Sequence, residues 1–152
     1  MKRWFVVLAL VAIPAVASAQ SMDKYVEMLR SDLRAEKTAY LTENMALSDS
    51  ESTRFWPIQR QYQNELAKLE DQRVALIKEY AANFSKMSDK MATDMVNRAF
   101  KLQDQRNALL KQYAGKISKA LSPRVAMRFV HCEGAIASMV DLKIRSELPV
   151  VE

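Results

Sequence analysis

The chain is poor in the residues that make turns, disulfides and common catalytic sites: its 152 residues include two Gly, four Pro, one Cys and one His. Because glycine and proline mark most turns, their scarcity favours few turns and long elements. A single cysteine, Cys132, excludes an internal disulfide. The one histidine stands beside that cysteine, and the sequence has no glycine-rich phosphate loop and no motif that couples a nucleophile to a base. We therefore expect neither an enzyme nor a bound cofactor.

The first 19 residues have the three parts of a secretory signal peptide. The basic start MKR precedes an apolar run from Trp4 to Ile13, and the small-residue site Ala17-Ser18-Ala19 follows. The run is too short, and too closely followed by polar chain, to span a membrane. The alternative, an N-terminal core helix, leaves the basic start and the cleavage site without a role. We predict cleavage before Gln20 and export of the mature chain to the periplasm of a bacterium.

The signal segment also carries part of the positive charge. The whole chain has 23 Lys and Arg against 18 Asp and Glu, a formal net charge of +5. Residues 1–19 contain two of these cations and no acid, which leaves 21 cations against 18 acids, or +3, in the mature chain. This small excess removes the main argument for a nucleic-acid partner, and we expect none.

Apolar residues recur at steps of three and four from Phe55 to Phe84, which is the period of an amphipathic helix. Three similar helix-start signals divide the chain: a capping box from Ser48 to Glu51, then Met87-Ser88-Asp89, then Leu121-Ser122-Pro123. Short turns make neighbouring helices antiparallel, so we predict an all-α fold of elongated, curved, up-and-down helical hairpins. The expected helices span about 23–45, 49–84, 89–119 and 123–146, in one domain, 20–146, followed by a tail, 147–152.

Pro57 lies about two turns inside the predicted helix 49–84. A proline there removes one backbone hydrogen bond and bends the helix. An equally good interpretation makes the first turns a separate short helix, with Pro57 at the start of the next one. In both cases the hairpin is bent or broken beside Trp56.

One phrase occurs twice: LEDQRVALIKEY at 69–80 and LQDQRNALLKQY at 102–113, identical at eight of twelve positions. At about 100° per residue, the Leu, Arg, Leu and Tyr of each copy share one helix face. Restricted composition also makes amphipathic helices alike, but eight ungapped identities exceed what that bias readily supplies. These stripe residues are Leu69, Arg73, Leu76 and Tyr80 in the first copy and Leu102, Arg106, Leu109 and Tyr113 in the second.

The arginine in each stripe interrupts an apolar face and has two interpretations. It can bridge to a carboxylate on a neighbouring helix, or it can line a wet surface that binds other polypeptides through apolar contact and charge. The second interpretation makes the eight stripe residues a candidate client-binding surface. A weaker echo, in which Leu47-Ser48 with Arg54-Phe55 matches Leu121-Ser122 with Arg128-Phe129, extends the repeat pattern to the last helix.

Methionines offer a different function, a metal-binding or metal-sensing protein. Three of them repeat every fourth residue in the predicted helix 89–119 and just before it, and another lies one turn before the lone histidine. Thioethers suit Cu(I), but methionines at helical spacing more often serve as flexible packing, and a lone cysteine is more simply a small hydrophobe. One Cys and one His cannot complete a structural zinc site within one chain. The weak candidate ligands are Met87, Met91, Met95, Met127, His131 and Cys132.

The helix-start signals resemble the Leu-Thr-x-x-Gln motif of the Spy/CpxP-like periplasmic proteins. Leu47-Ser48-Asp49-Ser50-Glu51 has Ser for Thr and Glu for Gln. The second copy, Met87-Ser88, has Met91 at the Gln position, and the third, Leu121-Ser122, has Val125 there. Ser and Glu keep the capping chemistry of the motif.

The resemblance covers roughly residues 25–146 in helix layout. It implies an antiparallel homodimer of bent hairpins, a thin cradle whose concave face holds unfolded or partly folded envelope proteins without ATP during envelope stress. Relatives act instead as accessory proteins of membrane sensor kinases, or bind metals. A layer one or two helices thick has too little core for its apolar stripes, so a partner chain or a client should cover the surplus. The Skp-like chaperones also need β-strands, which no alternating run predicts here; an elongated structural spacer stays an alternative.

Overall fold

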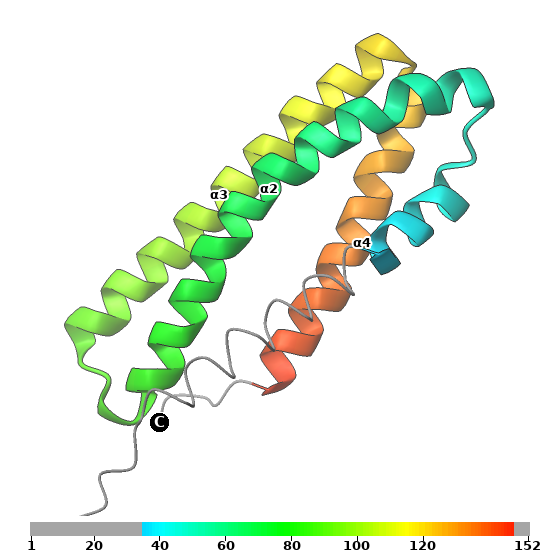
Figure 1. Ribbon diagram of the computed structural model, residues 1–152. Helices are drawn as coiled ribbons and strands as arrows, with labels where there is room; N and C mark the ends of the chain where they lie inside the picture. Colours follow the sequence, from blue (N-terminus) through cyan, green and yellow to red (C-terminus); the bar gives the residue numbers. More distant parts are fainter. Residues whose placement is uncertain (1–34, 148–152) are drawn as a thin grey trace, which may run out of the picture. The chain divides into compact units, whose positions relative to one another are not determined.

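The computed structural model describes residues 35–147 (Figure 1). The predicted signal peptide 1–19, the first part of the predicted helix 23–45 and the tail residues 148–152 lie outside these residues. The chain divides into two units after Thr38, and the described residues 39–147 belong to the second unit. The three long helices all belong to the second unit.

Every regular element in the described part of the chain is a helix. Residues 35–45 are helical, and α2 (Asp49–Asn83), the short 3-10 helix η1 (Phe84–Lys86), α3 (Asp89–Ala120) and α4 (Pro123–Glu147) follow in order. No strand occurs between residues 35 and 147. The predicted all-α, four-helix fold is confirmed, and the predicted ends of the three long helices differ from the observed ends by at most one residue.

The predicted capping residues stand at the helix starts. Ser48 and Glu51 form both bonds of a capping box: the Glu51 amide donates to Ser48 Oγ at 3.4 Å, and the Ser48 amide donates to Glu51 Oε2 at 2.9 Å. Ser88 and Ser122 accept in the same way from the amide three residues later, at 3.3 and 3.2 Å. Each bond satisfies a donor that the first turn of a helix leaves without a backbone partner, so a new helix begins at each of these three serines.

α2 continues through Pro57 without a break. The interpretation that made the first turns a separate helix is therefore wrong, and the proline lies inside a single helix. Pro57 is exposed, so the carbonyl that loses its amide donor one turn earlier can bond to water. In Figure 1 the first turns of α2 are inclined to the rest of the helix, as expected of a proline inside it.

α2 and α3 form an antiparallel hairpin, and α4 contacts α3, runs back from its end and diverges from the hairpin (Figure 1). The Cα atoms of α2 and α4 stay more than 8 Å apart, so these two helices meet only through side chains. Phe129 of α4 fills the space between them, with its ring centroid 6.1 Å from that of Phe55 and 5.2 Å from that of Tyr62. Aromatic rings in such edge-to-face contact bury a large apolar area, which holds α4 against α2 without backbone contact.

The core lies at one end of the hairpin. Its members come from the helix 35–45, the first half of α2, the second half of α3 and the first half of α4. They are Leu41, Met45, Phe55, Tyr62, Leu66, Leu109, Tyr113, Ile117, Val125, Ala126, Phe129 and Cys132. We call residues 69–104 the distal half of the hairpin, and there only Leu76 and Met95 are buried hydrophobic residues. The distal half therefore has almost no core of its own.

Candidate functional site

The eight stripe residues of the repeated phrase are used largely for packing between helices. None of the eight is exposed: Leu76, Leu109 and Tyr113 are buried, and the other five are half-buried. Leu69 packs against the core cluster to which Leu109 and Tyr113 belong. The two copies of the phrase therefore supply matching faces for neighbouring helices, and client binding by these eight residues stays a prediction.

Tyr113 and its counterpart Tyr80 have different surroundings although the sequence around them is repeated. Tyr113 is fully buried; its ring centroid lies 5.4 Å from that of Tyr62, and its hydroxyl donates to Glu65 Oε1 at 2.6 Å. Burial raises the pKa of the Tyr113 phenol, and the bond to Glu65 raises it further. Tyr80 is only half-buried, since the core does not extend into the distal half.

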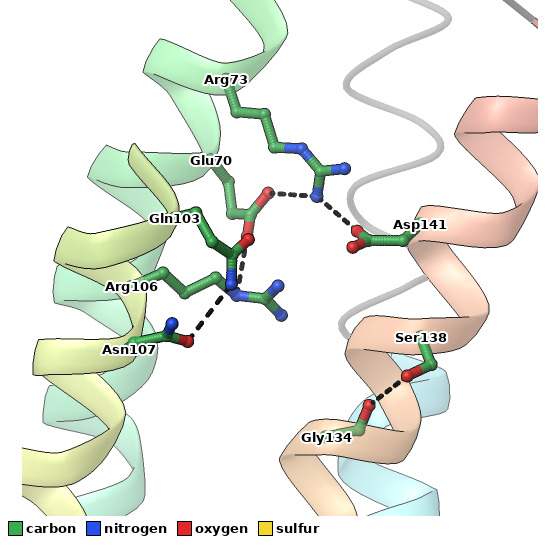
Figure 2. A network of polar contacts seen from close by, with 8 residues as sticks. All are labelled: Glu70, Arg73, Gln103, Arg106, Asn107, Gly134, Ser138 and Asp141. Carbon is green, nitrogen blue, oxygen red and sulfur yellow. Dashed lines mark hydrogen bonds and ion pairs between the residues drawn. The ribbon is translucent and has the colours of Figure 1, made fainter. Parts of the chain in front are cut away.

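The two arginines of the repeat converge on one carboxylate (Figure 2). Arg73 Nη1 lies 2.8 Å from Asp141 Oδ1 of α4 and 3.9 Å from Glu70 Oε2, and Arg106 Nε of α3 lies 3.7 Å from Glu70 Oε1. Alternating charges thus run from α3 through α2 to α4. The side chains of Arg73 and Asp141 are 25% and 28% exposed, so solvent screens the pair and its contribution is about 0.5–1 kcal/mol. This geometry agrees with the first interpretation of these arginines, in which each one bridges to a carboxylate on a neighbouring helix.

The sequence echo around Arg54 and Arg128 is a pair of reciprocal contacts. Arg54 Nη1 of α2 donates to the carbonyl of Ala120 at the end of α3 at 3.0 Å, and Arg128 Nη1 of α4 donates to the carbonyl of Ala46, just before α2, at 3.1 Å. Each acceptor immediately precedes a Leu-Ser motif. Ala46 has φ 43°, the left-handed conformation typical of a helix end, so the bond from Arg128 also ties down a strained residue.

The residues that resemble the Leu-Thr-x-x-Gln motif therefore have structural roles in this fold. Leu47 and Leu121 are half-buried against the core, and the serine after each one caps the following helix. Met87, at the equivalent place in the second copy, is half-buried beside its own capping serine. The hydrogen bond from the Ser48 amide lowers the pKa of Glu51 most, and the hydrogen bond from the Ser48 hydroxyl lowers it as well. The charges of Arg128 and Arg54 lower this pKa further.

Sequence reasoning missed Glu133, whose side chain is inside the core face of α4 and only 2% exposed. It hydrogen-bonds to Tyr62 of α2. Burial raises the pKa of the Tyr62 phenol, and the charge of Glu133 raises it further, while the charge of Arg106 lowers it. Glu133 lies four residues after Phe129, on the same helix face, so an angular projection of the predicted helix 123–146 would have found it.

The candidate metal ligands have different surroundings, with Met87 and Met91 half-buried. Met95 and Cys132 are buried, whereas Met127 and His131, which are one turn apart on α4, are exposed. Met127 and His131 therefore do not share the environment of the Cys132 thiol. Burial raises the pKa of the Cys132 thiol, and the charge of Glu133 raises it further, which disfavours the thiolate that binds metals. Among residues 35–147 no group of three or more His, Cys, Asp or Glu side chains could hold a metal ion.

Large exposed hydrophobic side chains are the other feature that sequence reasoning missed. Val96 and Phe100 are 52% and 68% exposed and lie one turn apart on α3, about 100° and 140° around the helix from the buried Met95. The remaining members of this set are Phe84, Met127, Met139 and Leu142. For Val96 and Phe100 the signal in the sequence is an apolar residue away from the main stripe of its helix, whereas Phe84 ends the apolar stripe predicted from Phe55.

In the described part of the chain, no helix has the length and apolar character needed to cross a membrane.

Comparison of the chain with models of protein families, with curated proteins and with solved structures gives no match in any of the three.

Proposed function

We propose that this chain is a periplasmic, ATP-independent, chaperone-like protein that binds unfolded or partly folded proteins of the cell envelope. The observation that carries the proposal is the exposure of Val96 and Phe100 in the distal half of the hairpin, where only two hydrophobic residues are buried. Apolar side chains one turn apart on a helix form a continuous contact surface. On a layer this thin they stay in water unless another polypeptide covers them.

A charged group lies one turn from this apolar pair: Asp104, four residues after Phe100 on α3, is exposed. On the opposite side of α3, Arg98 is paired with Glu79 of α2 at 2.8 Å and with Asp94 at 3.1 Å. Apolar contact is not directional, and exposed charges stay solvated while they attract oppositely charged segments. A surface with both elements supports weak binding of many unfolded sequences better than tight binding of one partner.

A homodimer is part of the proposal. The motif residues around Ser48, Ser88 and Ser122 resemble those of a family of antiparallel dimers, and a second copy would cover part of the exposed apolar surface. Sedimentation velocity over a concentration series measures this association. A chain that stays monomeric at all concentrations removes the dimer from the proposal and leaves client binding to be tested separately.

Light scattering of a model client that aggregates on dilution from denaturant tests the function. Chain 20–152, the predicted mature form, should suppress aggregation at about one chain per client without ATP, because the apolar contact needs no energy source. An unrelated basic protein of similar size and net charge controls for a simple charge effect. Undiminished aggregation at several-fold excess of the chain overturns the proposal.

A further inference from the structure

Charge is distributed unevenly along the α2–α3 hairpin. The distal half, residues 69–104, contains six Lys and Arg and six Asp and Glu. The other half of the hairpin, residues 49–68 and 105–120, contains seven Lys and Arg and three Asp and Glu. These two segments are in contact, because Arg54 bonds to Ala120 and Tyr62 packs on Tyr113. One half of the hairpin is therefore neutral and the other basic.

Three lysines of the basic half lie on the outer face of α3. We call Lys111, Lys116 and Lys119 the lysine face; all three are exposed. At about 100° per residue, Lys111 and Lys119 lie about 120° and 200° around α3 from the buried Ile117, on the side away from the core. They line an open hollow together with Ala108, Gln112 and Gly115.

Gly115 forms the floor of this hollow, and no packing contact requires a glycine at this position. A Cβ atom added at Gly115 meets nothing within 4 Å, so no close approach of another helix requires a glycine there. Glycine inside a helix is less stable than alanine, so it carries a penalty that packing does not explain. Its effect is to leave the surface between the lysines free of side-chain atoms.

One acid, Asp104, lies on the same side of α3 as Lys111, two turns before it and about 10 Å away along the helix. Glu65 accepts the hydrogen bond from Tyr113, and Lys116 Nζ lies 3.9 Å from the centroid of the Tyr113 ring. Lys111 and Lys119 make no ion pair with any residue of the described chain. The segment 39–51 contributes three acids, of which Glu51 belongs to the capping box. Two lysines of the face are therefore available to an outside anion.

We propose that the lysine face binds the anionic surface of a phospholipid membrane. Every cation on the face is lysine, a compact and strongly hydrated charge that suits mobile phosphate groups, whereas arginine and aromatic side chains, which dominate protein interfaces, are absent from it. The lysines span about 12 Å along one straight helix, and the small side chains between them let a flat surface approach. A predicted periplasmic chain has a membrane on either side.

This surface differs from the one proposed for clients. Val96 and Phe100 lie in the neutral distal half, whereas the lysine face lies in the basic half. Membrane attachment and client binding are therefore separable, and each can fail without the other.

Vesicle flotation tests the membrane proposal. Chain 20–152 is mixed at low ionic strength with vesicles of phosphatidylcholine, with or without phosphatidylglycerol. One variant carries Lys111→Gln, Lys116→Gln and Lys119→Gln. A control variant of equal net charge carries Lys86→Gln, Lys90→Gln and Lys101→Gln, three exposed lysines of the neutral half. Thermal melting by circular dichroism establishes that both variants are folded as the wild type is.

We expect the wild type to bind only the vesicles that contain phosphatidylglycerol and to release them as salt is added. A lysine near an anionic surface strengthens binding about fivefold, so loss of the two available lysines should weaken binding by the first variant about 25-fold, and the control should bind within about twofold of the wild type. Absence of wild-type binding, or equal losses in the two variants, overturns the proposal. So does binding of the face to soluble polyglutamate with no binding to vesicles, which would assign it to an acidic protein. If the first variant does not fold, a wild-type affinity that salt leaves unchanged overturns the proposal by itself.

Discussion

Arg73 of α2 and Asp141 of α4 are paired at 2.8 Å across helices whose Cα atoms stay more than 8 Å apart. Arg106, the second copy of Arg73 in the repeated phrase, reaches Glu70 at 3.7 Å in the same network (Figure 2). The charges of the repeat therefore link three helices at the border between the core and the distal half. A stability measurement can therefore distinguish arginines that bridge helices from arginines that bind a client protein.

Replacing both arginines should destabilise the fold. We expect Arg73→Ala with Arg106→Ala to lower the free energy of unfolding by about 1–2 kcal/mol, because three partly exposed ion pairs are lost, two of them at 3.7 and 3.9 Å. Urea denaturation at low and high salt measures this, and the loss should shrink at high salt since salt screens such pairs. Arg60→Ala, at an exposed position of α2, is the matched control. Unchanged stability together with weaker suppression of client aggregation would instead place the arginines on the working surface.

A buried and an exposed phenylalanine should differ in what their loss does to stability. Phe129→Ala should lower the free energy of unfolding by about 3–5 kcal/mol, because the side chain is fully buried against Phe55 and Tyr62 and its removal leaves a cavity. Phe100→Ala removes the same atoms from a residue that is 68% exposed and should change stability by less than about 0.5 kcal/mol. Chemical denaturation of both variants makes the comparison. Similar losses in the two would mean that Phe100 is covered in the native protein, as in a tight dimer.

The capping box of α2 should make stability depend on pH. Hydrogen bonds from Ser48 lower the folded pKa of Glu51, so its ionised form stabilises the fold above the unfolded pKa, and this contribution is lost as pH falls through the folded pKa. Melting temperature against pH should therefore show a larger gap between the wild type and Glu51→Gln at neutral pH than in acid. Glu43→Gln, at an exposed position, is the control. A gap that is constant with pH would contradict the capping role of the carboxylate.

The two glycines should each be replaceable by alanine with a gain in stability. Gly115 and Gly134 lie inside α3 and α4, neither has a positive φ, and an added Cβ meets nothing within 4 Å at either position. Gly115→Ala and Gly134→Ala should each raise the free energy of unfolding by about 0.5–1 kcal/mol. Thermal melting of the single and double variants measures the gain. A loss at either site would reveal a neighbour that a monomer lacks, such as a second chain.

The helix ends were predictable because their causes are local. Ser48, Ser88 and Ser122 each cap a helix through an amide only three residues away, so the sequence carries the whole signal. The membership of the core was not predictable in the same way. Tyr80 and Tyr113 occupy identical places in the repeat, yet only Tyr113 is fully buried, because contacts between distant segments gather at one end of the hairpin.

In the candidate site, too, local features were predictable and features that depend on helix packing were not. The stripe residues were found by their helical period, but their half-buried state and the partners Glu70 and Asp141 depend on how three helices pack, which no local pattern contains. Glu133 and Phe100 were missed for opposite reasons. One is a charged residue on a buried face and the other an apolar residue on an exposed face, so a prediction from residue type places each on the wrong side.

Client binding by the distal half is tested most directly by comparing two pairs of exposed apolar residues in the client-aggregation assay. Val96→Ser with Phe100→Ser alters the distal half of the hairpin, and Met139→Ser with Leu142→Ser alters similarly exposed residues of α4. We predict that the first double variant keeps its melting temperature and loses most of its suppression of client light scattering, while the second suppresses as the wild type does. Full suppression by the Val96 and Phe100 variant would contradict the assignment of client binding to the distal half.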